Sequence, residues 1–340
     1  MKYRIPPACR TLFPLLSIAI LVAVARGSEQ QDPGLLRLEK EIALPGVEGR
    51  IDHFSVDTAG DRIFIAALGN GTIEVVDISK GKCTAEIREL KEPQGLYYDS
   101  ATNRLYAASG GDGTLRIYDG TSLALQSTLQ LGDDADNVRY DESTTQIWIG
   151  YGSGRLGRVA AGEKAGEISL GSHPESFQLE RNGSRIFVNV PREFGVAVVD
   201  RTKGAVTAKW GLDRTFGNYP MALDEVDKRL FVACRVPARL VILDTNSGQV
   251  VAKLPIAGDT DDVFFDPTRH LIYVIGGEGA VDIVGLRDPN HYEHVGRTNT
   301  AAGARTGLFV PDLDRLFVAA PHRESQTARL LVYQIAQSRQ

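Results

Sequence analysis

Cysteine is scarce in this sequence, and sustained helical periodicity is absent from it. Of the three cysteines, only Cys83 and Cys234 follow the N-terminal segment, and they belong to different repeats of the pattern described below. A disulfide between them is therefore not expected, and the fold must depend on its hydrophobic core. Because no segment repeats its apolar residues with the helical period, the elements are expected to be strands.

Positive charge is also in short supply. The formal net charge of −5 becomes −9 without residues 1–27, because that segment holds four basic residues and no acid. Contacts to phosphate groups require clustered lysine and arginine, so no nucleic-acid partner is expected. The sequence further lacks a serine nucleophile elbow, a paired-cysteine motif and a haem-attachment motif, so no simple signature of an enzyme or an electron carrier is present.

Only one long apolar run occurs, over residues 12–25, and three basic residues precede it. Small residues at its end fit the cleavage pattern of a secretory signal. The alternative is an uncleaved membrane anchor, but the run contains Pro14 and is shorter than the roughly 20 residues that a spanning helix needs. We therefore expect residues 1–27 to be a cleaved signal peptide, and the mature chain to be exported, periplasmic or secreted, with no membrane span.

The remaining chain repeats a turn in which an acidic residue is followed five positions later by arginine, directly before an apolar strand with an aromatic residue. Four copies are close matches: Asp57–Arg62, Asp99–Arg104, Glu180–Arg185 and Asp224–Arg229. Looser copies occur at Asp141, Asp266 and Asp312. Equivalent positions lie 39 to 45 residues apart, which gives seven copies of one structural unit.

Each copy alternates short apolar strands with turns rich in glycine, asparagine, aspartate and serine, and four strands fit in each. This pattern predicts an all-β fold: a seven-bladed β-propeller of four-stranded antiparallel blades, in a single domain over residues 28–340. The blades are expected to begin near residues 50, 92, 134, 173, 218, 259 and 304. The seventh copy lacks its outermost strand, so residues 36–44 are expected to pair with the strand of Val332 and close the ring. A solenoid would need polar capping repeats, which this chain lacks.

The blade text resembles the YVTN-repeat family of bacterial propellers. The matching segments are Arg104–Ala108 with Gly113–Asp119, and Leu240–Asp244 with Gly248–Val250. The resemblance extends over the chain that follows the N-terminal segment. It implies a secreted or periplasmic propeller and says little about chemistry, because relatives include binding proteins, electron-transfer subunits and enzymes.

The copies differ where each innermost strand begins, on the face of the ring that also carries the turns between second and third strands. Three residues before the turn acid, every copy is apolar, as a shared core requires. Five residues before it, four of the seven copies are acidic: Asp52, Asp136, Glu175 and Asp261. A scaffold that repeats its core but varies its channel mouth is typical of a fold that carries a binding site.

A divalent cation is one candidate occupant of this mouth. The near-copies Gly132–Val138 and Gly258–Val263 lie three blades apart and are expected to face each other across the channel axis. Their carboxylates predict a possible metal set of Asp136, Asn137, Asp262 and His53. Oxygen ligands favour Ca²⁺ or Mg²⁺, and imidazole favours Zn²⁺ or Mn²⁺. The alternative is that these are solvated turn residues, or that nearby arginines supply the balancing charge.

A small polar or anionic ligand, or a partner protein, is the other candidate. The residues expected to bind it are Arg50, Asp52, His53, Asp134, Asp136, Asn137, His173, Glu175, Asp261, Asp262, Arg305, His322 and Arg323. The candidates for a catalytic role are His53, His173 and Glu175. Three hypotheses remain: a non-catalytic binding propeller, which we favour, a metal-dependent hydrolase or lyase of the lactonase type, and an electron-transfer subunit.

Overall fold

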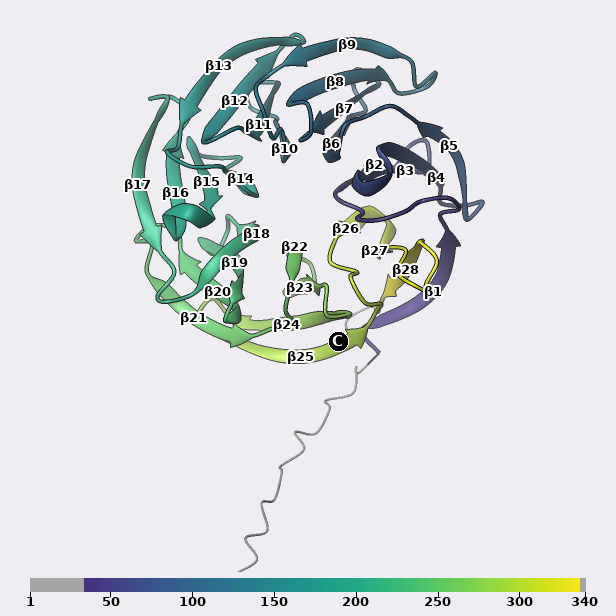
Figure 1. Cartoon of the computed structure of the whole chain (residues 1–340). Helices are drawn as coiled ribbons and strands as arrows, with labels where there is room; N and C mark the ends of the chain where they lie inside the picture. Colours follow the sequence, from purple (N-terminus) through teal and green to yellow (C-terminus); the bar gives the residue numbers. More distant parts are fainter. Residues whose placement is uncertain (1–33, 337–340) are drawn as a thin grey trace, which may run out of the picture. The chain divides into compact units, whose positions relative to one another are not determined.

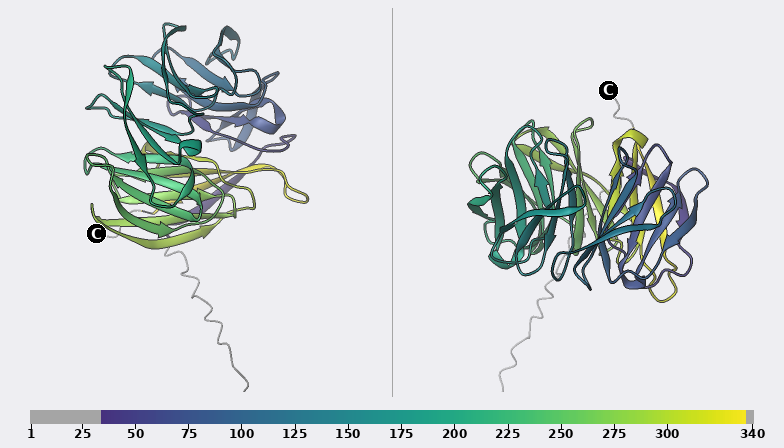
Figure 2. Two further views of the ribbon diagram at one scale, coloured as in Figure 1. Left: turned by 60° about the vertical axis from the view of Figure 1, so that its left-hand side comes forward. Right: turned by 90° about the horizontal axis from the view of Figure 1, so that it is seen from above.

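The computed structural model describes residues 34–336, which form seven four-stranded antiparallel sheets arranged as blades around a ring (Figure 1). The expected seven-bladed β-propeller is thereby confirmed. Figure 2 shows the same sheets from two further sides, with the strands of each blade running between the two faces of the ring. The expected signal peptide lies outside the described residues. No helix among residues 34–336 is long and apolar enough to cross a membrane.

In blades 1 to 6 the strands follow one another outward from the channel in chain order, and blade 7 takes its outermost strand from the start of the domain. Blade 1 contains β2 (Phe54–Asp57), β3 (Arg62–Ala67), β4 (Thr72–Asp77) and β5 (Lys82–Ile87). Blade 2 contains β6 (Pro93–Asp99), β7 (Arg104–Ser109), β8 (Thr114–Asp119) and β9 (Leu125–Gln130). Blade 3 contains β10 (Val138–Asp141), β11 (Gln146–Tyr151), β12 (Arg155–Ala160) and β13 (Glu163–Ser169). Blade 4 contains β14 (Phe177–Leu179), β15 (Arg185–Val190), β16 (Gly195–Asp200) and β17 (Ala205–Gly211).

The remaining blades follow the same plan. Blade 5 contains β18 (Phe216–Asp224), β19 (Arg229–Val236), β20 (Ala238–Asp244) and β21 (Val250–Pro255). Blade 6 contains β22 (Thr260–Asp266), β23 (Leu271–Gly276), β24 (Ala280–Asp288) and β25 (His291–Asn299). Blade 7 contains β26 (Gly307–Val310), β27 (Arg315–Ala320) and β28 (Arg329–Ile335). Three single-turn 3₁₀ helices lie in turns: η1 (Leu68–Asn70), η2 (Pro191–Glu193) and η3 (Pro311–Leu313).

The ring closes within blade 7, where the first strand of the described chain supplies the outermost position. Strand β1 (Leu36–Ala43) pairs antiparallel with β28, and Lys40 lies opposite Val332. The blade therefore joins strands from the two ends of the domain, as the strand count in the sequence requires. With β1 in place, blade 7 has four strands like the other six blades, and β28 has a hydrogen-bonded neighbour on both sides.

The core lies between blades and is built mainly from the second strand of each one. In β3, five of six residues are buried, including Phe64 at 0% exposure, because both faces of the blade pack against neighbours. Equivalent aromatic residues Phe187, Phe231 and Phe317 are also fully buried. The outermost strand instead alternates exposed and half-buried side chains, as in β17. Burial on both faces explains why the inner strands read as continuous apolar runs.

Arginines of the repeated turn join neighbouring blades on the face opposite the channel mouth. Arg62 pairs with Asp57 of its own turn at 2.6 Å and donates a hydrogen bond of 2.7 Å to the carbonyl of Gly120 in blade 2. Arg229 likewise donates to the carbonyl of Pro289 in blade 6 at 2.7 Å. Each such arginine satisfies a buried acid or carbonyl while connecting two blades, so the sequence repeat also encodes the contact between repeats.

Candidate functional site

The segments that precede the innermost strands meet at the channel mouth and surround a cavity of about 480 Å³. Its lining includes seven residues that the sequence analysis selected: Arg50, Asp134, Asp136, His173, Glu175, Asp261 and Arg305. These come from blades 1, 3, 4, 6 and 7. The structure therefore brings together positions as far apart in the chain as Arg50 and Arg305.

One backbone pattern gives the mouth residues a common orientation. The amide of Asp52 donates to the carbonyl of Ala66, that of Asp136 to Gly150 and that of Glu175 to Asn189, at 2.7 to 3.0 Å. In each blade the bond joins the start of the innermost strand to the end of the second strand. Because three blades repeat this bond, equivalent acidic side chains are delivered to the same level of the channel.

We call the group of Arg50, Arg235, Arg305, Asp259 and Asp261 the arginine wall. Arg235 lies 2.7 Å from Asp261, and Arg305 lies 2.8 Å from Asp259. Arg50 reaches Asp261 at 3.5 Å. The wall thus gathers three guanidinium groups from blades 5, 7 and 1 around two carboxylates of blade 6.

Two further contacts hold the wall in place. The Arg235 guanidinium carbon lies 3.9 Å from the centre of the Tyr219 ring, and its Nε donates to the carbonyl of Thr260 at 3.0 Å. Burial, together with the negative charge of Asp52, outweighs the nearby arginines and raises the pKa of Asp261 to about 6. The carboxyl group of Asp261 therefore binds a proton more readily than an exposed aspartate does, although all three arginines of the wall contact it.

His53 lies deeper in the channel, between two buried carboxylates. Its Nε2 is 3.6 Å from Asp52, and its Nδ1 is 3.4 Å from Asp262. Burial disfavours the charged imidazole, but the negative charges of Asp262 and Asp52 prevail and raise the pKa of His53 to about 10. The side chain is consequently an imidazolium at neutral pH, and a protonated ring has no lone pair for a metal.

This arrangement differs from the metal set expected from the sequence, which combined Asp136, Asn137, Asp262 and His53. Asp262 also accepts a hydrogen bond of 2.9 Å from the backbone amide of Gly307. Two cations, His53 and the half-buried Arg139, interact electrostatically with both Asp262 and Asp136. They bring positive charge to these carboxylates, which is the alternative to a metal ion that the sequence analysis gave, but Asp136 Oδ1 has no hydrogen-bond partner among residues 34–336.

Asn137 supports its neighbours rather than facing the cavity. Its amide nitrogen donates to Asp136 Oδ2 at 3.0 Å, and its amide oxygen accepts from Arg139 Nη2 at 3.2 Å. Burial lowers the pKa of Arg139, although Asp262 and Asp136 act in the opposite sense. The asparagine thus fixes the orientation of one carboxylate oxygen and leaves the other available.

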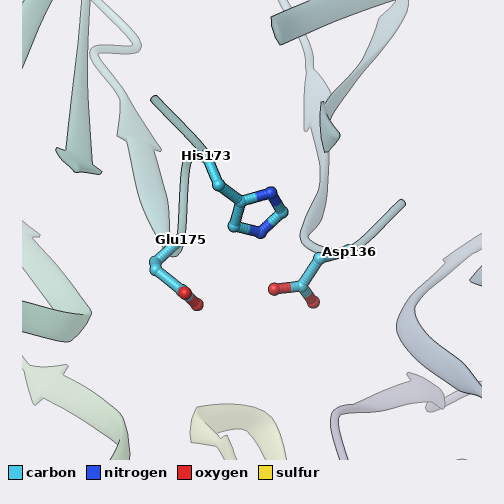
Figure 3. Close-up of side chains that lie close together, drawn as sticks. All are labelled: Asp136, His173 and Glu175. Atoms are coloured by element: carbon cyan, nitrogen blue, oxygen red, sulfur yellow. The ribbon is translucent and has the colours of Figure 1, made fainter. Parts of the chain in front are cut away.

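Asp136, His173 and Glu175, which we call the mouth trio, converge from blades 3 and 4 (Figure 3). One donor atom of each lies within 4.8 Å of the other two. Burial raises the pKa of Asp136 to about 7, with further repulsion from Glu175, and positive His53 acts against the rise. Burial, followed by the charge of Asp261, raises the pKa of Glu175 to about 7 as well.

Two expected ligand residues lie away from the cavity. His322 pairs with Glu48 at 2.8 Å, and Arg323 forms a backbone bridge with Gln326. Both belong to the turn between β27 and β28, which folds on itself and is absent from the cavity lining. Within this turn, Arg323 and Gln326 exchange backbone hydrogen bonds, and Gln326 Nε2 donates to the carbonyl of Pro321 at 2.6 Å.

Several lining residues were outside the set expected to bind a ligand: Gln94, Asp133, Ser153, Arg192, Tyr219 and Arg235. Gln94 and Tyr219 occupy the same repeat position as the mouth acids, so comparison of blades could have identified them. Arg192 belongs to η2, in the turn between the second and third strands of blade 4. Its contribution depends on how far that turn reaches, which the repeat pattern does not determine.

Comparison with solved structures identifies a widely used architecture. A chain from the crystal structure of a mitotic checkpoint complex matches with a TM-score of 0.74 and 13% identity, over 97% of this chain and 99% of that one. Hydrazine synthase from Kuenenia stuttgartiensis matches with a TM-score of 0.67 and 16% identity, over 82% of this chain and 95% of that one. No family model and no curated protein match the sequence.

The fold is a WD40-like seven-bladed propeller. In all, 1662 chains of solved structures match it, so the similarity indicates architecture and cannot select an activity. Such a scaffold is suited to binding a protein or a ligand. Any more specific function must be argued from the mouth itself.

Proposed function

We propose that this protein is a non-catalytic binding propeller that takes a small polar ligand with an anionic group into the cavity at the channel mouth. We further propose that it is an exported, YVTN-like protein, on the basis of the sequence of its N-terminal segment and its blades. The metal-dependent hydrolase alternative gains no support from the similar structures.

The observation that carries the proposal is the spare hydrogen-bonding capacity of the arginine wall. A guanidinium group has five N–H donors in a planar fork that matches a carboxylate or phosphate. Arg50 contacts Asp52 and Asp261 through Nη2 alone, and its side chain is 41% exposed. Arg305 contacts Asp259 and Asp261 through Nη1 and Nε, so its Nη2 has no ion-pair partner among residues 34–336.

The cavity also has the size and polarity expected of a ligand site. Its volume of about 480 Å³ falls within the range of roughly 300–1,000 Å³ typical of small-molecule sites. Its lining is dominated by charged side chains. A small ligand with several polar groups therefore fits better than an apolar one.

The test is calorimetric titration of small anions into metal-free protein, in buffer containing chelator. Phosphate, succinate and citrate are the probes, and glucose is the neutral comparison. The protein is expected to bind at least one anion more tightly than glucose. The double variant Arg50→Gln plus Arg305→Gln is expected to weaken that binding by about tenfold or more, because charge-assisted hydrogen bonds are lost.

Arg323→Gln is the matched control, because this arginine lies on the same face but outside the cavity lining. It is expected to leave anion affinity unchanged. The proposal fails if no anion binds, or if the double variant and the control bind anions as tightly as the original protein. Thermal melting of all variants verifies that each one is folded.

A further inference from the structure

The three side chains of the mouth trio face one another (Figure 3). Asp136 reaches the trio from the loop before β10, and His173 and Glu175 reach it from the loop before β14. The two loops are held by the repeated backbone bonds to Gly150 and Asn189. The trio is therefore mounted on two rigid blades rather than on a free loop.

Asp136 presents one buried oxygen without a partner. The residue is 6% exposed, and its Oδ2 accepts the hydrogen bond from Asn137. Its Oδ1 is buried and has no hydrogen-bond partner within residues 34–336. An unpaired buried carboxylate oxygen costs free energy, and it requires a proton or a cation to offset that cost.

His173 is oriented in the manner of a metal ligand. Its Nδ1 lies 2.7 Å from the carbonyl oxygen of Gly152. A carbonyl oxygen only accepts hydrogen bonds, so Nδ1 donates to it and Nε2 is the ring nitrogen left to bind a metal. Nδ1 also lies 3.5 Å from Asp134 Oδ2. A backbone carbonyl that fixes the tautomer from behind is the usual support of a histidine that binds a metal.

Glu175 completes the set from the side of the cavity. The structure gives its carboxylate no hydrogen bond and no ion pair in the described part of the chain, although the residue is half-buried. Oxygens of two carboxylates and one imidazole nitrogen thus lie close together. Their mutual repulsion is relieved when a cation lies between them.

We propose that Asp136, His173 and Glu175 bind a divalent transition-metal cation, with Zn²⁺ preferred over Mn²⁺ and Ca²⁺ weakest. The imidazole nitrogen favours Zn²⁺ over the oxygen-seeking cations. Three protein ligands leave a fourth position, which opens on the cavity. Zinc binds such ligands at about 2.0–2.2 Å, so binding draws the donor atoms closer than their present separation.

The site goes beyond the proposed anion binding, because its geometry involves none of the three wall arginines. It also replaces the metal set expected from the sequence: Asp136 is common to both, whereas His173 and Glu175 take the places of Asn137, Asp262 and His53. The reason is geometric. Both ring nitrogens of His53 lie near the carboxylates of Asp52 and Asp262, whereas the carbonyl of Gly152 takes only Nδ1 of His173 and leaves Nε2 for a metal.

The test uses the mature protein, stripped with chelator and then dialysed into a non-coordinating buffer with chloride as the only anion. Calorimetric titration with ZnCl₂, MnCl₂ and CaCl₂ measures affinity, and elemental analysis after dialysis measures stoichiometry. One Zn²⁺ per chain is expected. The visible spectrum of the Co²⁺-loaded protein is expected to show the intense bands of a four-coordinate site.

Asp136→Asn and Glu175→Gln preserve side-chain shape and remove one ligand charge each. Each is expected to weaken Zn²⁺ binding on the order of 100-fold or more, because losing a direct ligand costs at least as much as losing a residue that only supports one, which costs about 10–100-fold. Asp133→Asn is the matched control, since this acid lines the same cavity but lies outside the trio. It is expected to change Zn²⁺ affinity less than threefold.

The proposal is overturned if the protein binds no Zn²⁺ under these conditions, if Ca²⁺ binds more tightly than Zn²⁺, or if the two trio variants bind Zn²⁺ as well as the control does. A protein that holds its charge balance by keeping a proton on Asp136 or Glu175 would give the first result. Because the titration contains no organic anion or phosphate, its failure is separable from failure of the anion test, which is made without metal.

Discussion

The two faces of this ring treat charge in opposite ways. On the face opposite the channel mouth, acids and arginines are matched, as where Arg201 of blade 4 lies 2.6 Å from Asp141 of blade 3. On the mouth face, the arginine wall holds three guanidinium groups, but Asp136 and Glu175 beside it form no ion pair with an arginine among residues 34–336. The acids are therefore paired on one face and partly unpaired on the other.

The carboxyl pKa values record this difference. Burial alone would raise the pKa of Asp141, but hydrogen bonds from Ser143 and Thr144 and the charge of Arg201 lower it below its ordinary value. In the mouth trio, burial and neighbouring acids instead raise the pKa of Asp136 and Glu175 to about 7. We infer that the ion pairs on the face opposite the mouth stabilise the fold, whereas the unpaired acids of the mouth trio lower its stability, as groups kept for binding often do.

Arg201→Ala should have the largest effect. The arginine side chain is 8% exposed and also donates to the carbonyl of Glu180 at 2.6 Å, so its loss leaves buried Asp141 without a counter-charge. Removing one partner of a buried pair costs about 3–5 kcal/mol, and we expect a decrease of about 4 kcal/mol in the free energy of unfolding. Urea denaturation followed by circular dichroism measures it.

Arg181→Ala is the matched control, since Arg181 lies on the same face, is 77% exposed and only approaches Glu142 at 3.8 Å. The control should change the free energy of unfolding by less than about 0.5 kcal/mol. If both variants lose the same small amount, the opposite face does not stabilise the ring through its ion pairs, and the contrast between faces is lost.

His53→Ala should have the next largest effect, because it removes the cation between Asp52 and Asp262. We expect a loss of about 3 kcal/mol at pH 6. The pKa of His53 is raised to about 10 in the folded protein, so its stabilising contribution is complete below about pH 6.5 and disappears as the pH rises toward 10. Urea unfolding at pH 6 and at pH 9.5 should therefore show the variant approaching the original protein.

His270→Asn is the control for this pH series, because His270 is exposed and has a positive φ that asparagine tolerates. Its stability difference from the original protein should be small at both pH values. A His53→Ala difference that stays constant between pH 6 and pH 9.5 would mean that the imidazolium is not the stabilising species.

Glu175→Gln should have the smallest effect and the opposite sign. The carboxylate has no hydrogen bond or ion pair in the described structure and lies near other acids, so neutralising it should raise the free energy of unfolding by about 1 kcal/mol. The measurement is made in chelator, so that bound metal does not contribute. Glu142→Gln on the opposite face should produce no gain, and destabilisation by Glu175→Gln would contradict an excess of negative charge at the mouth.

The sequence was sufficient for the propeller because its core repeats. The turn acid, the arginine and the aromatic strand recur at nearly constant spacing, and each recurrence corresponds to one blade. Strand count alone also required the pairing of β1 with β28. These features depend on the spacing of the repeats and on the pattern of apolar residues, and both can be seen in a single sequence.

The sequence was less informative about the mouth, where residue types differ between blades more than they do in the core. Comparison of blades placed Asp136 and Glu175 at equivalent positions of the repeat. The structure brings both to the channel mouth because the same backbone hydrogen bond holds each of them. It could not determine that His53 would be protonated between Asp52 and Asp262, because that depends on side-chain directions and distances across the channel. Arg192 was missed for a similar reason, since the reach of its turn is set by packing.

The pairing of β1 with β28 also has a consequence for how the molecule is made. During synthesis β1 emerges first, yet its partner emerges only after nearly the whole domain has been translated. Until then the growing chain carries an unpaired strand at one end and an unfinished blade at the other. Completion of blade 7 therefore depends on the last-made part of the domain, and a nascent chain that stalls before Arg329 offers β1 to whatever edge it meets first.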